Sequence, residues 1–249
     1  MISFFRKNRQ NLLATGKTGK YLKYAIGEIF LVVVGILIAL GIDGWNTDRI
    51  EKNSLKNYYK RIIVELESEA NNAEYQKKKL DSLIDYNQRA LKIIDSNNID
   101  SLMTLKKLLG ATATSWGLIY EFPITREFIN QNYLSKIEND SLKLGFELLN
   151  SSFQHSETLN DYNISQYVNT IEPFFIQHIN YSETVLPRYA KGLIQGGPET
   201  QYEDLLNNLE LWNIITFKLE SLITESGNLG NTIQVLDFLK KQLKKEIES

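Results

Sequence analysis

The feature that most constrains this chain is an unbroken apolar run of 14 residues, Ile29 to Ile42. Extending the run back to Tyr24 gives 19 residues that contain a single charged side chain, Glu28. A helix of that length covers about 28 Å, close to the ~30 Å hydrocarbon core of a bilayer. Trp45 follows the run, as expected for an aromatic ring at the headgroup level. The sequence therefore predicts a transmembrane helix over residues 24–42.

Charge predicts the orientation of this helix. The first 23 residues contain no acidic side chain and six basic ones: Arg6, Lys7, Arg9, Lys17, Lys20 and Lys23. The first charges after the apolar run are acidic, Asp43 and Asp48. Under the positive-inside rule, residues 1–23 form a cytoplasmic basic arm and residues 43–249 are exported.

A cleaved signal peptide is the alternative to a membrane anchor. Ala39-Leu40-Gly41 would be its cleavage site, and it is a poor match to the small-residue pattern. The basic region and the apolar stretch are both longer than in typical signal peptides, which favours an uncleaved anchor.

Three residues in the predicted span suggest roles beyond anchoring. Glu28 is an acid inside the apolar stretch, where ionisable residues are often functional. It also lies only one turn into the span, where it reaches water or pairs with Lys23 or Lys20, and this interfacial interpretation is favoured. Gly35 and Ala39 form a small-xxx-small step that permits close helix packing, a weak indication of self-association.

Composition excludes several classes of function. The formal net charge is −2, but the residues after position 23 contain 22 basic and 30 acidic side chains. An acidic folded part argues against nucleic-acid binding. The absence of cysteine excludes disulfides, thiolate catalysis and cysteine-ligated metals.

No catalytic, cofactor or metal motif is recognisable in the sequence. His155 and His178 are 23 residues apart and do not have metal-ligand spacing. Glu65, Glu67 and Glu69 are spread around a helix and are predicted to be solvated. We expect no enzyme activity, no cofactor and no evident small-molecule ligand.

The exported part has a helical pattern. No Gly or Pro occurs from position 45 to 109, and residues 47–95 are predicted to form one long helix. Its apolar stripe consists of Leu55, Tyr59, Ile62, Leu66, Ala73, Leu80, Leu83, Ala90 and Ile94. Polar residues that interrupt the stripe, such as Asn87, favour packing within a bundle over a free two-stranded coil.

The remainder is predicted as shorter helices. Gly110 should close a short helix, and residues 111–123 should form a loop or an isolated strand whose aromatic side chains fill core. A helix from Asp140 should kink or end at Pro173, and a last helix should break at Gly227 and Gly230. The predicted fold is all-α: one transmembrane helix, a long helix and an elongated helical bundle.

The N-terminal block resembles a family of single-span membrane proteins of Bacteroidetes, classed as a domain of unknown function. The matching stretches are FFRK at 4–7, RQNLL at 9–13, GKTGKY at 16–21, KYAIGEI at 23–29, LVV at 31–33, GILIAL at 35–40 and WN at 45–46. The chain departs from the family at residues 41–44, where it has GIDG in place of the usual QINN. The resemblance implies a Gram-negative inner membrane and a periplasmic helical domain, and it implies no activity.

The leading functional interpretation is a membrane-anchored, non-enzymatic interaction protein of the cell envelope. Its expected partners are the lipid bilayer and other envelope proteins, or a second copy of itself. A sensor is an alternative, although only 23 residues precede the span to carry an output. A force- or proton-coupling subunit of a larger inner-membrane assembly, in which Glu28 titrates, is the other alternative.

Overall fold

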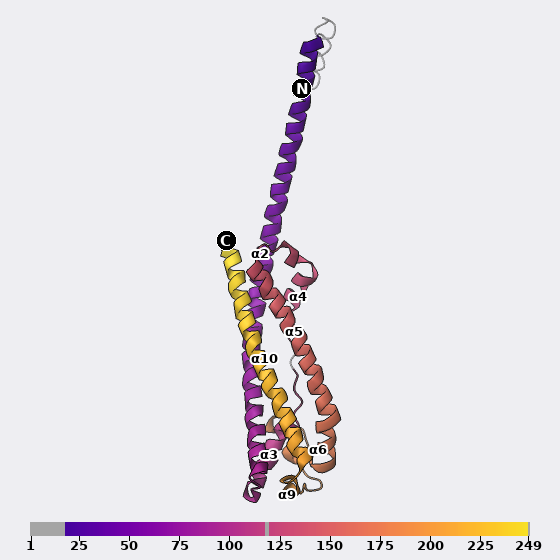
Figure 1. The fold of residues 1–249 in the computed structure, drawn as a ribbon, viewed down its shortest axis with the longest axis vertical. Helices are drawn as coiled ribbons and strands as arrows, with labels where there is room; N and C mark the ends of the chain where they lie inside the picture. The colour runs from indigo at the N-terminus through magenta and orange to yellow at the C-terminus, as the bar shows by residue number, and fades with distance from the viewer. Residues whose placement is uncertain (1–17, 118–119, 249) are drawn as a thin grey trace. The chain divides into compact units, whose positions relative to one another are not determined.

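The computed structural model describes residues 18–117 and 120–248, and every regular element in those residues is a helix (Figure 1). This confirms the predicted all-α class. The chain divides into two units at residues 57 and 58. The second unit, Tyr58–Ser249, is called the helical domain below.

The longest element is α2, which runs from Thr18 to Asp95. It includes the predicted 47–95 helix and continues towards the N-terminus through the apolar run. Eight of the nine predicted stripe residues are buried, and Leu55 is partly exposed. The helical period of the stripe therefore identified the face of α2 that packs in the helical domain.

The first unit consists, among the described residues, of the N-terminal part of α2. Its large apolar side chains are exposed: Ile29 is 64% exposed and Leu40 is 63% exposed. Among the described helices, only this one contains a stretch long and apolar enough to cross a membrane, and none of that stretch is buried by the rest of the chain. Those side chains are therefore not covered by the part of the chain that the structure describes.

The helical domain contains two further long helices and several short ones. The elements after α2 are η1 (Ile99–Ser101), α3 (Leu102–Thr112), α4 (Pro123–Asn130), η2 (Tyr133–Lys136), α5 (Asp140–Gln166), the π-helix η3 (Tyr167–Ile171), α6 (Glu172–His178), α7 (Tyr181–Thr184), α8 (Pro187–Ala190), α9 (Tyr202–Leu205) and α10 (Leu209–Glu248).

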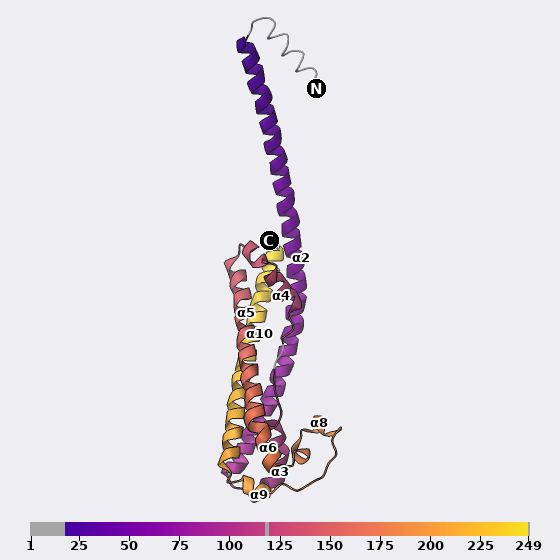
Figure 2. The same cartoon turned by 90° about the vertical axis from the view of Figure 1, so that its right-hand side faces the viewer.

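Helix α10 runs antiparallel to both α2 and α5, and the three lie side by side (Figures 1 and 2). On α2, Glu67 pairs with Lys244, and further along Asp81 accepts a hydrogen bond from Ser226. On α5, Asn139 likewise donates to Glu246, and Ser156 accepts from Asn228. Helices α2 and α5 therefore run in the same direction.

Because α2 and α5 are parallel, the chain must return along the domain between them. Thr112 at the end of α3 donates to the buried Asn87, whereas Thr125 in α4 donates to Glu65. Those two positions on α2 are about 33 Å apart, since each helical residue rises 1.5 Å. Thirteen residues span that distance only if most are extended. Residues 113–122, the return segment, are non-helical where they are described. The loop predicted over residues 111–123 is therefore confirmed except at its ends, since 111 and 112 belong to α3 and 123 belongs to α4.

Aromatic side chains close the core around the end of the return segment. Phe122 is 1% exposed, and its ring centroid lies 4.7 Å from that of Phe153 on α5. Phe128 on α4 stacks on Phe146 of α5 at 5.1 Å. The interpretation of the aromatic group as core is confirmed for Phe122, while Trp116 and Tyr120 are partly buried.

Two helix-ending predictions were wrong. Helix α3 continues through Gly110 to Thr112, and α10 continues through Gly227 and Gly230 to Glu248. Helix α10 gains burial from Leu222, Leu229 and Leu236 on both sides of these glycines. Tertiary packing of this kind outweighs the ~1 kcal/mol cost of a glycine in a helix.

The prediction of a solvated glutamate face was wrong for Glu65, which is 9% exposed. Its carboxylate accepts the backbone N–H groups of Ile124 at 2.7 Å and Thr125 at 2.9 Å, and the Thr125 hydroxyl at 2.6 Å. Residue Phe122, at the N-cap of α4, makes no side-chain cap bond. Glu65 therefore caps α4 from a neighbouring helix.

Glu65→Ala is expected to lower the free energy of unfolding by about 2–4 kcal/mol, because it leaves buried N–H groups without an acceptor. Glu67→Ala is the matched control, since the Glu67 pair with Lys244 is exposed and costs less than about 1 kcal/mol to remove. Urea unfolding followed by circular dichroism measures both. Equal losses in the two variants would contradict the capping role.

Two of the three mispredicted glycines, Gly110 and Gly227, should respond in opposite ways to alanine. At Gly110 a Cβ would meet the backbone carbonyl oxygen of Thr184, so Gly110→Ala should destabilise the domain by about 2–3 kcal/mol. At Gly227 nothing lies within 4 Å of the Cβ position, so Gly227→Ala should stabilise it by about 0.5–1 kcal/mol. Thermal melts distinguish the signs, and a destabilised Gly227→Ala would contradict an unbroken α10.

Candidate functional site

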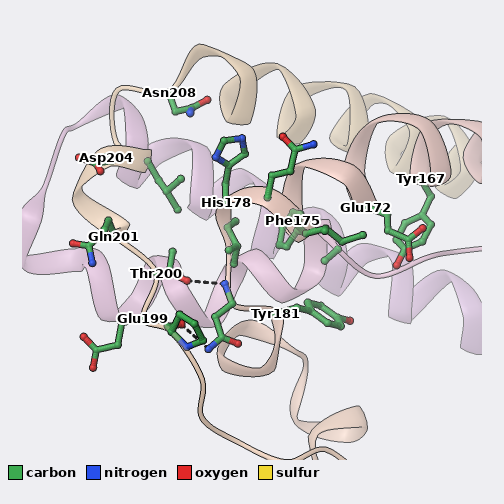
Figure 3. Close-up of a pocket in the computed structure, with 17 residues that line it drawn as sticks. Tyr167, Glu172, Phe175, His178, Tyr181, Glu199, Thr200, Gln201, Asp204 and Asn208 are labelled. Atoms are coloured by element: carbon green, nitrogen blue, oxygen red, sulfur yellow. Dashed lines mark hydrogen bonds between the residues drawn. The ribbon is translucent and has the colours of Figure 1, made fainter.

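The candidate site is a cleft in the helical domain, bounded by α6, α9 and the segment 198–201 (Figure 3). Its volume is about 770 Å³. We call it the α6–α9 cleft. Ligand sites in proteins commonly measure about 300–1,000 Å³, so the cleft has room for a small molecule or a few residues of peptide.

One wall of the cleft follows from Pro173. Proline has no N–H, so the α-helical hydrogen bond to the carbonyl four residues earlier cannot form there. The chain widens instead into the π-helix Tyr167–Ile171, in which the Glu172 N–H donates to the Tyr167 carbonyl. The predicted kink at Pro173 is thus a change of helix type, and the helix ends at His178. Such π-helical turns are rare and are frequently found at functional sites.

The π-helix places two polar groups at one end of the cleft. Figure 3 shows the side chains of Tyr167 and Glu172 next to each other there. Burial raises the pKa of the Tyr167 hydroxyl, and the nearby Glu172 carboxylate raises it further. The Tyr167 hydroxyl is therefore held protonated and serves as a hydrogen-bond donor.

The opposite wall is held by Asn180. Its backbone N–H donates to Thr200 Oγ1 at 2.8 Å, and its Nδ2 donates to the carbonyls of Gly196 at 3.0 Å and Pro198 at 2.9 Å. Gly196 and Gly197 have φ values of +123° and +107°, which residues with a Cβ rarely adopt. The side chain of Asn180 thus fixes segment 196–200 against the end of α6.

The cleft is acidic. Its charged lining residues are Glu172 at one end and Glu199 and Asp204 at the other, and no Lys or Arg lines it among the described residues (Figure 3). The three carboxylates are exposed and do not converge on one point. The cleft therefore favours cationic groups at separate positions.

Apolar side chains of α6 and the residue after it also line the cleft. Figure 3 shows Phe175 between Glu172 at one end and Thr200 and Asp204 at the other. Phe175 and Ile179 are buried, whereas Ile176, the residue after Phe175, is 77% exposed. His178 is also exposed, and its ring lies 4.7 Å from that of Phe174. The cleft offers an apolar contact flanked by negative charge.

Besides Glu65, two acidic or basic side chains are buried in the described part of the domain, and both are on α10. Lys218 is 2% exposed, and its Nζ donates to the carbonyl of Thr114 in the return segment at 2.9 Å. Burial lowers the pKa of Lys218 to about 8. Lys218 therefore supplies a donor for the carbonyl of Thr114, a buried residue outside any helix.

Glu225 is the second buried ionisable group. It is 2% exposed, and its Oε2 accepts no hydrogen bond from the part of the chain that the structure describes. Burial raises its pKa to about 7. A carboxylate in such surroundings is costly, so the protonated form is favoured in the folded protein.

The residues that the sequence analysis singled out in the predicted span belong to the first unit, whereas the cleft is in the helical domain. Glu28, Gly35 and Ala39 are exposed along α2, and no atom lies within 4 Å of a Cβ built on Gly35. Lys23 is exposed as well. Arg6, Lys7, Arg9 and Lys17, and the side chain of Lys20, lie outside the described residues.

Sequence reasoning missed the cleft. His155 and His178 are both exposed, and neither indicated a binding site in the sequence. Asn180 carries no motif, because its partners are backbone carbonyls 16 and 18 residues away. The one sequence signal that pointed to this region was the Gly196-Gly197-Pro198 loop. A loop of this kind needs hydrogen bonds from another segment to hold it in place.

Comparisons with family models, with curated proteins and with solved structures gave no match. The family resemblance of the N-terminal block therefore stays a prediction.

Glu225→Gln should remove a pH dependence of stability. The folded pKa of about 7 lies above the ordinary value of 4.5, so this group's contribution is complete below pH 4.5 and is lost as pH rises through 7. The free energy of unfolding of the wild type should fall by about 3 kcal/mol more than that of Glu225→Gln between pH 4.5 and 8. Urea titrations at several pH values measure this difference.

The control is Glu220→Gln, an exposed position on the same helix. It should follow the wild-type pH profile. Parallel profiles for the wild type and Glu225→Gln would show that Glu225 is ionised at its ordinary pKa.

Proposed function

We propose that this chain is a membrane-anchored, non-enzymatic interaction protein of the cell envelope. The observation that carries the proposal is the exposure of the apolar part of α2. Ten large apolar side chains between Ile29 and Ile42 are each 46–67% exposed. Each such side chain gains about 1.5–3 kcal/mol when it is fully removed from water, so the segment requires an apolar surrounding. Its length of about 28 Å suits a bilayer.

The proposed orientation rests on charge. The basic arm of residues 1–23 stays in the cytoplasm, the span covers residues 24–42, and residues 43–249 are exported. With the family resemblance, this corresponds to a Gram-negative inner membrane and a periplasmic helical domain. The bilayer is then one partner and an envelope protein is the other.

The α6–α9 cleft of the helical domain supports an interaction role. The cleft combines carboxylates at its two ends with an exposed isoleucine, Ile176, on its α6 wall. Exposed charges and a single apolar contact suit recognition of another molecule. Gly35 and Ala39, exposed on one face of α2, add a site where two copies pack in the bilayer.

The absence of cysteine makes the orientation directly measurable. We expect a membrane-impermeant maleimide to label Ser151→Cys, an exposed position on α5, in spheroplasts. Ser3→Cys should be labelled only after lysis. Replacing the six basic residues of the arm with Gln should reduce or invert this asymmetry, because the positive charges hold the arm inside.

The same membranes test the interaction role. Gentle solubilisation should release a complex with a mass greater than that of one 28.7 kDa chain, and mass spectrometry identifies the other component. A bare monomer would contradict the interaction role. Labelling of Ser3→Cys in spheroplasts, or a mature chain that begins after Gly41, would contradict the anchor.

A further inference from the structure

We infer that the α6–α9 cleft binds an extended peptide segment of the partner in which an apolar residue lies between two basic residues. The inference rests on the proposed function and names the chemistry of the partner. It follows from the arrangement of charge, apolar surface and rigid walls in the cleft.

The charges are separated rather than clustered. Glu172 lies at one end of the cleft and Asp204 at the other (Figure 3). A single small cation would contact only one of them. Among the described residues, no group of three or more His, Cys, Asp or Glu side chains is arranged to hold a metal ion. Cationic groups spaced along one ligand complement both ends at once.

The wall between the two acidic ends is apolar, because Phe175 lies there and Ile176 follows it on α6 (Figure 3). Phe175 is buried, whereas Ile176 lines the cleft and is 77% exposed. An aliphatic side chain of the ligand would remove Ile176 from water. A polyamine has the charges but does not have this side chain, so the pattern favours a peptide.

The walls of the cleft are preformed. Asn180 holds the 196–200 segment with three hydrogen bonds of 2.8–3.0 Å, and the π-helix holds Tyr167 and Glu172 at the other end. A preformed site loses little conformational entropy on binding. The volume of about 770 Å³ admits a few residues of an extended chain.

The test uses the full chain in nanodiscs of phosphatidylcholine, a zwitterionic lipid that does not attract basic peptides by charge. The probe is the fluorescein-labelled peptide Ser-Lys-Leu-Lys-Ser, compared with Ser-Glu-Leu-Glu-Ser and Ser-Lys-Ser-Lys-Ser. Fluorescence polarisation should show the first peptide binding at least about tenfold more tightly than the second, because two charge contacts become repulsive.

Substitutions locate the binding. The double variant Glu172→Gln/Asp204→Asn should weaken binding of the lysine–leucine peptide by about five- to tenfold. The matched control Glu74→Gln/Glu147→Gln removes two exposed carboxylates that do not line the cleft, and it should bind as the wild type does. Ile176→Ser should weaken the binding of Ser-Lys-Leu-Lys-Ser and leave the binding of Ser-Lys-Ser-Lys-Ser unchanged.

Three results of the peptide assay would overturn the inference. The first is equal affinity for Ser-Lys-Leu-Lys-Ser and Ser-Glu-Leu-Glu-Ser, and the second is an equal effect of the two double variants. The third is that the polyamine spermidine displaces Ser-Lys-Leu-Lys-Ser as easily as it displaces Ser-Lys-Ser-Lys-Ser. A co-purifying partner retained by Glu172→Gln/Asp204→Asn would leave the proposed function in place and remove the cleft as its interface. Selective peptide binding with no co-purifying partner would contradict the interaction role while supporting the specificity of the cleft.

Discussion

The helical domain depends on satisfying backbone groups of the return segment, residues 113–122, and of the first turn of α4, which follows it. Two parallel long helices require the chain to travel back between them, and a non-helical chain has backbone polar groups that no helix ladder satisfies, some of them buried, as at Thr114. Charged side chains solve this problem. Glu65 on α2 accepts the first N–H groups of α4, and Lys218 on α10 donates to the Thr114 carbonyl. Both charges are buried because their partners are.

Glu225 is a buried charged side chain for which the described part of the fold supplies no partner at one of its two oxygens. It lies two turns after Lys218 on the same helix and is equally buried, yet its Oε2 has no donor in the described part of the chain. The folded protein responds by favouring the protonated acid, with a pKa of about 7. Burial therefore shifts the pKa of both groups toward the neutral form, but among the described residues Lys218 has a hydrogen-bond partner and Glu225 Oε2 does not.

The α6–α9 cleft arises from the same kind of local requirement. Pro173 removes a donor from the helix and the chain adopts a π-helix, while two glycines at positive φ need the Asn180 side chain to fix their loop. Together they leave a rigid, acidic depression with one exposed isoleucine, which is the basis of the proposed binding specificity.

The all-helical class, the apolar segment and the buried face of α2 could be predicted from the amino-acid sequence, because each depends on a period or a run within one helix. Eight of the nine predicted stripe residues are buried for that reason. The roles of Glu65, Lys218, Asn180 and the α10 glycines depend instead on the tertiary structure. Glu65 is bonded to residues 59 and 60 positions away, and Lys218 to a carbonyl 104 positions away. Gly227 and Gly230 stay helical because leucines on both sides are buried by other helices. Local propensity carries no information about such distant partners, so burial and hydrogen bonding across the fold determined these roles.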